Sequence, residues 1–369
     1  MNKKTALSFC CLFIWSTFAT GQTAAEYWKL YGDKPIIVQQ NNGGSKQNLK
    51  FIKFENGMLV AELDGGAAEV SLPVNDTMAA TLSYRIPKMK LIRGFIQQEN
   101  YQEALKLMRP EIYPLIKFHE VPESFRKIHD PLRMLLRVLV SGGEYDEAGY
   151  ILSKIQLNKV DIRYSRFAAN LIDLYIEMQQ LDKATEIANS LPIDDIYAEN
   201  ITKLVDLADS LRAASQYKTV IPIYEAILPV VPEESQLSMK MWLAYCLTLD
   251  GQEEKGTRIF NELEEPEPGN RYFSLYKLLE GSRLYRADQY GRALDILTRG
   301  FVRARTSYDW IPEMLFLIGD CYAKADDNSA AGNVWEEIAT LYPSSPWAER
   351  AQESLEKLPK PSQQTEEPS

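Results

Sequence analysis

The feature that most constrains this chain is a short motif that recurs at nearly constant spacing. Each copy follows a polar turn, and six of the seven have a small residue in the fourth place, as in the segment Tyr101–Ala104; in the fourth copy Val220 replaces it. The spacings between successive copies are 44, 36, 36, 36, 37 and 38 residues. Such a period predicts helical hairpins, each of which buries its apolar face only against its neighbours. The fourth-place residues are Ala104, Ala148, Ala184, Val220, Gly256, Ala293 and Ala331.

Each repeat is predicted to be two antiparallel helices joined by a tight polar turn, because the small residue lets the second helix approach the first closely. Three places depart from this plan. The first interval is longer than the others, so residues 110–128 are expected to hold a long connection. Pro222 falls inside a second helix and predicts a kink or a late start there. Asp130 followed by Pro131 predicts a helix N-cap and a first helical position.

The later repeats carry further residues of the same pattern, including a glycine and a tyrosine before the motif and a proline after it. With these features the chain resembles the tetratricopeptide repeat (TPR) family over about residues 80–358. The resemblance implies a mainly α, right-handed α-α solenoid of about seven TPR-like hairpins with a C-terminal capping helix. The residues that carry the resemblance are Gly281, Tyr285, Tyr290, Ala293, Gly319, Tyr322, Ala331, Trp335 and the closing prolines Pro232, Pro268 and Pro343.

The end of the last repeat, Ala331–Ala351, is similar to those of bacterial periplasmic repeat proteins that serve envelope biogenesis. They include the outer-membrane protein assembly lipoprotein and the cell-division coordinator that works with the Tol–Pal system. This resemblance implies association with an envelope or outer-membrane complex.

The residues before the array have a β pattern. Asn56-Gly57 lies between two apolar runs and predicts a type I′ hairpin, because both turn residues need positive φ. The result is a small β-meander of three or four strands, which serves either as a cap of the array or as a recognition element. The strands are expected at Pro35–Gln39, as an edge strand, and at Leu49–Glu55, Met58–Leu63 and Ala67–Val74.

The first residues have the pattern of a secretory signal peptide. A basic start is followed by the apolar run Leu7–Phe18, too short to span a bilayer, and by the small residues Ala19–Gly21. We expect cleavage after Gly21 and a periplasmic or secreted chain with no transmembrane segment; retention of the leader as a membrane anchor is the alternative. The predicted division is a signal peptide over 1–21, the β module over 22–78, the array over 79–358 and a disordered tail over 359–369.

Composition narrows the class of partner. The chain is 45% hydrophobic and 25% charged, which is typical of a globular protein. Loss of residues 1–21 removes two of the 41 basic residues and none of the 51 acidic ones, so the net charge becomes 39 − 51 = −12. So acidic a chain is a poor nonspecific binder of nucleic acid or anionic membranes. A nucleic acid is therefore not expected as a partner. The resemblance to the TPR family implies a protein or peptide partner instead.

No catalytic constellation stands out. The two histidines, His119 and His129, fall in the long connection, where we expect surface loop residues; a metal site is the alternative. Cys246 and Cys321 remain after loss of the leader, lie two repeats apart, and are expected to be buried and unpaired. The sequence therefore predicts no enzyme activity, no cofactor and no metal.

The family resemblance places the first helix of each repeat on a concave groove. The hypothesis is a noncatalytic protein–protein interaction scaffold or adaptor of the cell envelope, whose groove takes a peptide with an acidic end near its first repeats. Internal pairing of the arginines with acids of neighbouring repeats is the alternative there. An accessory or binding subunit for a small molecule or glycan is the alternative function. The groove candidates are Arg93, Arg133, Arg137, Arg166, Asp173, Asp209, Arg212, Tyr245, Tyr285, Arg286 and Asp320.

Overall fold

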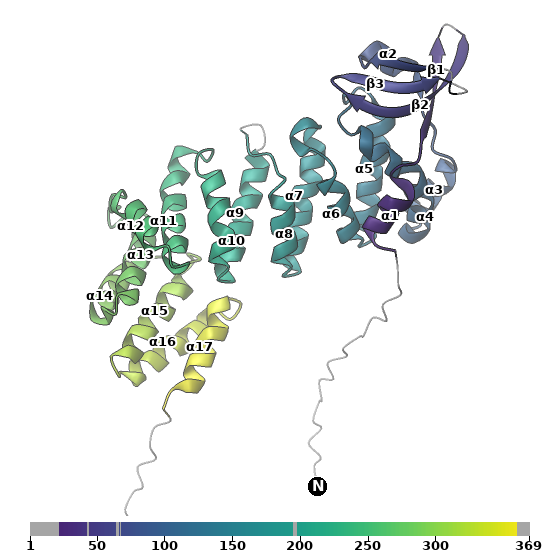
Figure 1. The fold of residues 1–369 in the computed structure, drawn as a ribbon. Helices are drawn as coiled ribbons and strands as arrows, with labels where there is room; N and C mark the ends of the chain where they lie inside the picture. The colour runs from purple at the N-terminus through teal and green to yellow at the C-terminus, as the bar shows by residue number, and fades with distance from the viewer. Residues whose placement is uncertain (1–21, 43, 64–65, 67, 195–197, 360–369) are drawn as a thin grey trace, which may run out of the picture. The chain divides into compact units, whose positions relative to one another are not determined.

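The computed structural model describes residues 22–42, 44–63, 66, 68–194 and 198–359. The predicted signal peptide and all but the first residue of the predicted tail lie outside this part of the chain. Contacts divide the chain into two compact units, which we call the N-terminal unit (residues 1–167) and the C-terminal unit (residues 168–369). Both are mainly helical, and a small sheet belongs to the N-terminal unit (Figure 1).

Helical hairpins follow one another through both units, which confirms the predicted fold class. The helices of the N-terminal hairpins are α3 (Met89–Gln97), α4 (Tyr101–Ile112), α5 (Arg126–Ser141) and α6 (Tyr145–Ser153). The boundary between the units falls within α7 (Ile162–Glu177). The C-terminal unit continues with α8 (Leu181–Ala188), α9 (Ala198–Ala213), α10 (Tyr217–Ile227), α11 (Glu233–Leu249), α12 (Glu253–Asn261), α13 (Phe273–Arg286), α14 (Tyr290–Phe301), α15 (Ile311–Lys324), α16 (Asn328–Leu341) and α17 (Pro346–Lys357).

The recurring motif marks the start of each second helix. In all seven hairpins the second helix begins at the first residue of the motif, and the fourth residue is buried, as predicted. Gly256 shows why this residue is small: a Cβ atom there would lie 2.5 Å from Oγ1 of Thr248 and 2.8 Å from the carbonyl oxygen of Ala244. The motif therefore records the close approach of two antiparallel helices.

One turn geometry joins the two helices of every hairpin. The residue two positions before each second helix is left-handed, with φ between 56° and 83°. The next residue donates its backbone N–H back into the first helix, as from Asn100 to the carbonyl of Phe95 at 2.9 Å, which is a Schellman-type C-cap. Two of the seven left-handed residues are glycines, and the others are Glu99, Gln179, Ser215, Asp288 and Asp326.

The sheet is antiparallel and has five strands in the order β4-β3-β2-β1-β5. One face is apolar because buried residues alternate along the strands, as Ile36 and Val38 do on β1. The Asn56-Gly57 turn has positive φ at both residues, which confirms the predicted hairpin. The strands are β1 (Ile36–Asn42), β2 (Ser45–Glu55), β3 (Met58–Leu63), β4 (Glu69–Pro73) and β5 (Leu82–Ser83).

A strand lies at the predicted place, as β1, but it is not the edge strand that was predicted at Pro35–Gln39. β1 pairs with β2 on one side and with β5 on the other, where Gln39 is opposite Ser83. β5 is two residues long and follows the short helix α2 (Asp76–Thr81), so no strand pattern in the sequence marks it. Its pairing returns the chain to the sheet immediately before the first hairpin.

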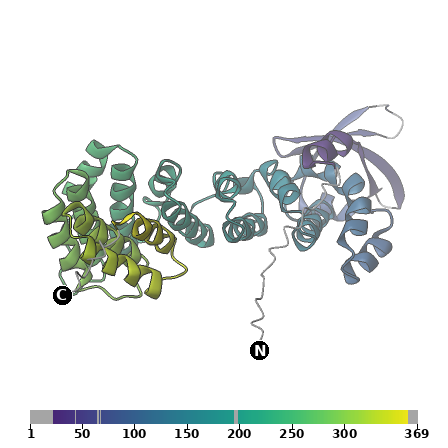
Figure 2. The same ribbon diagram turned by 90° about the horizontal axis from the view of Figure 1, so that it is seen from below.

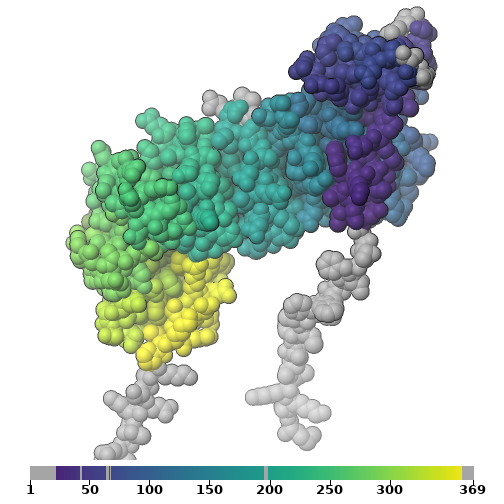
Figure 3. All heavy atoms as spheres, in the orientation of Figure 1, coloured from purple at the N-terminus to yellow at the C-terminus, as the bar shows by residue number. Residues whose placement is uncertain are grey.

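Aromatic side chains pack the sheet against the long connection between α4 and α5. Phe51 on β2 lies 5.7 Å from Phe118 and 6.2 Å from Phe125, measured between ring centroids. Phe118 ends the 3-10 helix η1 (Tyr113–Phe118). The space-filling view shows the dark-blue sheet module in close contact with helices of the same unit (Figure 3).

The two histidines of this connection are buried, which corrects the prediction that they are surface loop residues. His119 and His129 are 8% and 1% exposed. His119 donates from Nδ1 to the carbonyl of Ile116 at 2.8 Å and accepts from the backbone N–H of Gln156 at 3.1 Å. His129 donates from Nε2 to the carbonyl of Val121 at 2.8 Å and accepts from the Tyr164 hydroxyl at 3.0 Å. Burial lowers the pKa of both rings, so they are neutral hydrogen-bonding residues that fix the connection.

A helix at the start of the described chain packs against the first hairpins. α1 (Ala24–Tyr31) begins with a capping box between Thr23 and Glu26. Its Tyr27 ring lies 4.2 Å from the Arg109 guanidinium, which forms a buried ion pair of 2.6 Å with Glu147. α1 therefore covers a charged pair between the first two hairpins, and Figure 3 shows it in purple against the N-terminal unit.

Two proline predictions need correction. Pro131 lies inside α5 and not at its first position, because α5 begins a turn earlier at Arg126. The Asp130 carboxylate does not cap the helix and instead accepts a hydrogen bond of 2.6 Å from Arg133. Pro222 lies inside α10, which begins at Tyr217 without the delay that its position suggested.

In the C-terminal unit the last helix contacts an earlier turn. Arg350 on α17 donates to Oγ of Ser215 at 2.7 Å, across 135 residues. In Figure 2 the yellow α17 lies among the green helices of the same unit. Cys246 and Cys321 are buried with free thiols, as predicted. None of the helices in the described ranges is long and apolar enough to cross a bilayer.

Candidate functional site

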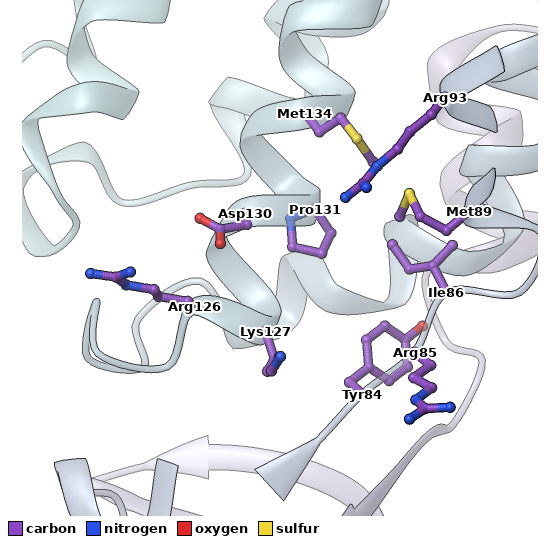
Figure 4. A pocket seen from close by; sticks show the side chains of 10 residues that line it. All are labelled: Tyr84, Arg85, Ile86, Met89, Arg93, Arg126, Lys127, Asp130, Pro131 and Met134. Atoms are coloured by element: carbon purple, nitrogen blue, oxygen red, sulfur yellow. The ribbon is translucent and has the colours of Figure 1, made fainter. Parts of the chain in front are cut away.

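A basic pocket in the N-terminal unit is the candidate binding site. It has a volume of about 380 Å³ and lies between the chain after β5, helix α3 and helix α5. Figure 4 shows side chains from these three segments around it, with the strands of the sheet nearby. The chain that follows the sheet and the first helices of the first two hairpins thus form one site together.

The local sequence sets the wall that follows β5. Tyr84 donates its hydroxyl to the carbonyl of Glu111, at the end of α4, over 2.8 Å. Burial raises the pKa of Tyr84 to about 12, so its hydroxyl stays protonated and keeps this donor role. Ile86 is buried, and Lys88 has the left-handed φ of 58° that turns the chain into α3. These contacts fix the wall against the first hairpin.

The pocket combines an apolar floor with basic walls. Its apolar side chains are Ile86, Met89, Pro131 and Met134, and its basic side chains are Arg85, Arg93, Arg126 and Lys127. All four basic residues are exposed, and none has a hydrogen bond or ion pair with another residue in the described part of the chain. The only acid in the lining, Asp130, is paired with Arg133 at 2.6 Å. The excess of positive charge is therefore available to a ligand.

Among the predicted groove residues of the N-terminal unit, only Arg93 lines this pocket. Figure 4 shows its guanidinium reaching toward Met134. Arg133 is buried between Glu123 and Asp130, each at 2.6 Å, so it follows the internal-pairing alternative. Arg137 on α5 and Arg166 on α7 are exposed and lie outside the pocket lining.

Sequence reasoning missed three of the four basic residues. Arg126 and Lys127 were assigned to the connection because the helix was expected to begin at Asp130. Both residues lie in the first turn of α5. The sequence feature that could have indicated this is that they stand immediately before the apolar residues that recur at helical spacing along α5. Arg85 gave no signal, since it follows a two-residue strand.

In the C-terminal unit, two predicted groove residues are buried with a shared acid. Arg212 and Tyr245 are 6% and 2% exposed, and Glu313 is 1% exposed. Glu313 accepts from Arg212 at 3.1 Å and from the Tyr245 hydroxyl at 2.5 Å. The Arg212 guanidinium also stacks on the Trp242 ring at 3.6 Å. We call this group the Arg212–Glu313 cluster; it joins α9, α11 and α15 and has no accessible surface for a partner.

The remaining predicted residues of the C-terminal unit also have partners within the chain. Asp173 pairs with Lys203 at 2.8 Å, and Asp209 accepts from the Tyr224 hydroxyl at 3.3 Å. Burial raises the pKa of Asp209. The other contacts are Tyr285 with Asp320 at 3.3 Å and Arg286 with Glu253 at 3.0 Å.

Among the predicted groove residues, Asp320 has a clearly raised pKa. Burial raises its pKa to about 6, although the Tyr285 hydroxyl that donates to it favours the charged form. Within the described ranges no group of three or more His, Cys, Asp or Glu side chains is arranged to hold a metal ion.

Comparison with known proteins gives similarity at the level of helical repeats. No family model matches the chain, and no curated protein matches it. A solved tetratricopeptide repeat protein from Parabacteroides merdae is 16% identical, with 73% of this chain and 96% of that chain covered and a TM-score of 0.41. A structure of Naa15/Naa10 bound to HypK is 15% identical over 73% of this chain and 39% of that chain, with a TM-score of 0.35. Pseudomonas aeruginosa pilF is 16% identical over 72% of this chain and 95% of that chain, with a TM-score of 0.30. The repeat assignment therefore rests on the hairpins of this chain.

Proposed function

We propose that the protein is a noncatalytic scaffold of the bacterial cell envelope that binds a segment of another protein in the basic pocket. The observation that carries the proposal is the set of four basic side chains without partners around an apolar floor. Arginine binds carboxylates in a bidentate way, and an apolar pocket centre supplies most of the affinity at a protein interface. The matching segment has an acidic residue close to a large apolar side chain.

Charge reversal in the pocket tests this function. The variant Arg93→Glu with Arg126→Glu should lower capture of the partner from an envelope extract at least tenfold, because it repels an acidic segment. Arg137→Glu is the matched control, since Arg137 is exposed on α5 outside the pocket. Equal capture by both variants would overturn the proposal. Arg133 is unsuitable as a probe because its loss would break the pairs with Glu123 and Asp130.

A small anionic molecule or glycan is the second candidate for the same pocket. A volume of about 380 Å³ is within the range of small-molecule sites. Photo-crosslinkers at Lys127 and, as a control, at exposed Lys240 on α11 separate the two candidates. A protein adduct at Lys127 alone supports the scaffold. A melting temperature raised by small acids or sugars, without a protein adduct, supports the second candidate.

The envelope location rests on the leader pattern over residues 1–21 and on the similarity of the last repeat to periplasmic proteins. Expression in a bacterium followed by fractionation and N-terminal sequencing tests it. A periplasmic chain that begins at Gln22 is the expected product. A full-length chain in the cytoplasm would contradict the proposed location. It would not bear on the basic pocket, which the charge-reversal experiment tests separately.

A further inference from the structure

A second pocket lies in the C-terminal unit, at the ends of α11, α12 and α13. Its volume is about 190 Å³, and its lining includes Thr248, Glu253, Thr257, Arg283 and Arg286. Arg283 and Arg286 are three residues apart on α13 and share one face of that helix. Two like charges at this spacing repel each other, and the one carboxylate in the lining, Glu253, pairs with Arg286 and not with Arg283.

Arg283 is unusual among the less exposed cations of the chain. In the part of the chain that the structure describes, four arginine and lysine side chains are less than a tenth exposed, and each has a carboxylate partner: Arg109, Arg133, Arg212 and Lys277. Arg283 is partly buried and has no carboxylate at ion-pair distance among the described residues. Burial lowers the pKa of its guanidinium, although Glu280, which forms its ion pair with Lys277, favours the charged form from a distance.

Neutral groups hold Arg283 in place. Its guanidinium lies 4.3 Å from the centre of the Phe260 ring, and Nη2 donates to Oγ1 of Thr257 at 3.1 Å. These contacts leave other N–H groups of the guanidinium for a ligand. The Thr257 hydroxyl accepts from Arg283, so its own proton is also available for donation.

The charges of the pocket favour a singly charged ligand. Arg286 uses Nε and Nη2 for the same oxygen of Glu253, at 3.3 and 3.0 Å. Glu253 therefore neutralises one of the two arginines, and the pocket carries one uncompensated positive charge. A carboxylate has one negative charge and two oxygens that fit the guanidinium N–H pairs. A phosphate dianion would add more charge than the pocket can balance.

We infer that this pocket binds a carboxylate group through Arg283, with Arg286 and Thr257 as further donors. The inference is independent of the proposed function, because it concerns the other unit and different residues. The carboxylate belongs either to a small free acid or to an Asp or Glu side chain of a bound protein.

The test uses the full chain carrying Arg93→Glu and Arg126→Glu, so that carboxylates bound at the first pocket do not contribute. Potassium acetate is titrated against potassium chloride of equal ionic strength, and the ¹⁵N–¹H signal of Arg283 Nε is followed by NMR. Acetate should shift this signal with saturation, and chloride should not. Equal responses to the two salts would overturn the inference.

Variants give the second test. Because Arg283→Gln lacks the Arg283 signal, acetate binding by the variants is followed at the Nε signal of Arg286 in the same pocket. Arg283→Gln should weaken acetate binding at least tenfold, whereas Arg299→Gln, which removes an exposed arginine paired with Asp295 on α14, should leave it unchanged. Glu253→Gln removes the competing carboxylate and should tighten binding about threefold or more. Because tighter binding requires a folded protein, this result cannot come from misfolding. Weaker binding by Glu253→Gln would count against the inference.

A capped tripeptide with one central aspartate distinguishes the two sources. Binding at least tenfold tighter than that of acetate assigns the site to a protein side chain. Binding equal to or weaker than that of acetate assigns it to a small free acid.

Discussion

Both units have arginines on the first helices of their hairpins but use them differently. Arg93 on α3 is exposed at a pocket and has no partner in the described chain, whereas Arg212 on α9 is buried against Glu313. The acid that neutralises Arg212 comes from a helix 101 residues later. A basic residue on a first helix therefore becomes a binding group only where no distant acid reaches it.

The units also differ in their buried titratable groups. The N-terminal unit buries the neutral His119 and His129, and burial lowers the pKa of both. The C-terminal unit half-buries Asp320, and burial raises its pKa to about 6. Acidification therefore charges a group in the first unit and neutralises one in the second.

The largest effect is expected from the Arg212–Glu313 cluster. Glu313→Gln removes the closer and more deeply buried of the two carboxylates beside Arg212 and leaves only Asp209, at 3.7 Å. This should lower the free energy of unfolding of the C-terminal unit by about 3–5 kcal/mol. Chemical denaturation followed by hydrogen exchange for each unit measures it. Glu254→Gln, which removes the exposed partner of Arg258, is the control and should cost less than about 1 kcal/mol. Equal losses of unfolding free energy in the two variants would show that the buried Glu313 contributes no more to stability than the exposed Glu254.

A pair of glycine substitutions compares packing in the two units. Gly281→Ala places a Cβ atom 2.5 Å from the buried side chain of Leu297 and should destabilise the C-terminal unit by about 1–3 kcal/mol. Gly94→Ala, in α3 beside the basic pocket, meets no atom within 4 Å. It should stabilise the N-terminal unit by about 0.5–1 kcal/mol, because alanine loses less backbone entropy in a helix. Melting temperatures that move in the same direction would contradict this.

Acidification should change the stability of the two units in opposite directions. An unfolded histidine has a pKa of about 6.5, so the lowered folded-state pKa values stabilise the N-terminal unit above that pH, and the contribution is lost as the pH falls below it. The raised pKa of Asp320 contributes stability that is present near pH 4 and lost as the pH rises through about 6. Between pH 7.5 and 5, hydrogen-exchange protection factors, corrected for the intrinsic rate at each pH, should therefore fall in the N-terminal unit and rise in the C-terminal unit.

The variant Asp320→Asn tests the predicted gain in stability of the C-terminal unit on acidification. The amide still accepts from the Tyr285 hydroxyl and has no charge to bury, so the variant should be more stable than the wild type at pH 7, by about 1–3 kcal/mol. It should also lose the gain in stability on acidification. A variant less stable than the wild type at pH 7 would show that the charged form of Asp320 is favoured.

The smallest effects are expected at the shared turn. Glu99→Gly and Asp326→Gly replace left-handed residues, one in each unit, with the residue that adopts positive φ without strain. Each should stabilise its unit by a few tenths of a kcal/mol up to about 1 kcal/mol. A gain in one unit only would show that the common turn is under different strain in the two units.

The parts of the fold that could be predicted from the sequence are those marked by a short local sequence pattern. The motif located the start of all seven second helices, and Asn56-Gly57 located a hairpin, because both signals lie within a few residues of the structure they specify. Helix starts without a local signal were harder: Asp130-Pro131 suggested a start that α5 makes one turn earlier. The two-residue β5 was missed because its pairing partner is on β1, more than 40 residues away.

The sequence by itself thus determined the repeat, its register and the small residues that let helices approach. Only the tertiary structure decided which charged residues remain exposed. Arg133 and Arg212 each pair with an acid three residues earlier on the same helix, but their other partners, Glu123 and Glu313, come from the long connection and from a distant helix. The basic pocket brings together Arg85 from the chain after β5, Arg93 from α3 and Arg126 from α5. Helical periodicity acts over three or four residues, whereas these pairings depend on how hairpins tens of residues apart come into contact.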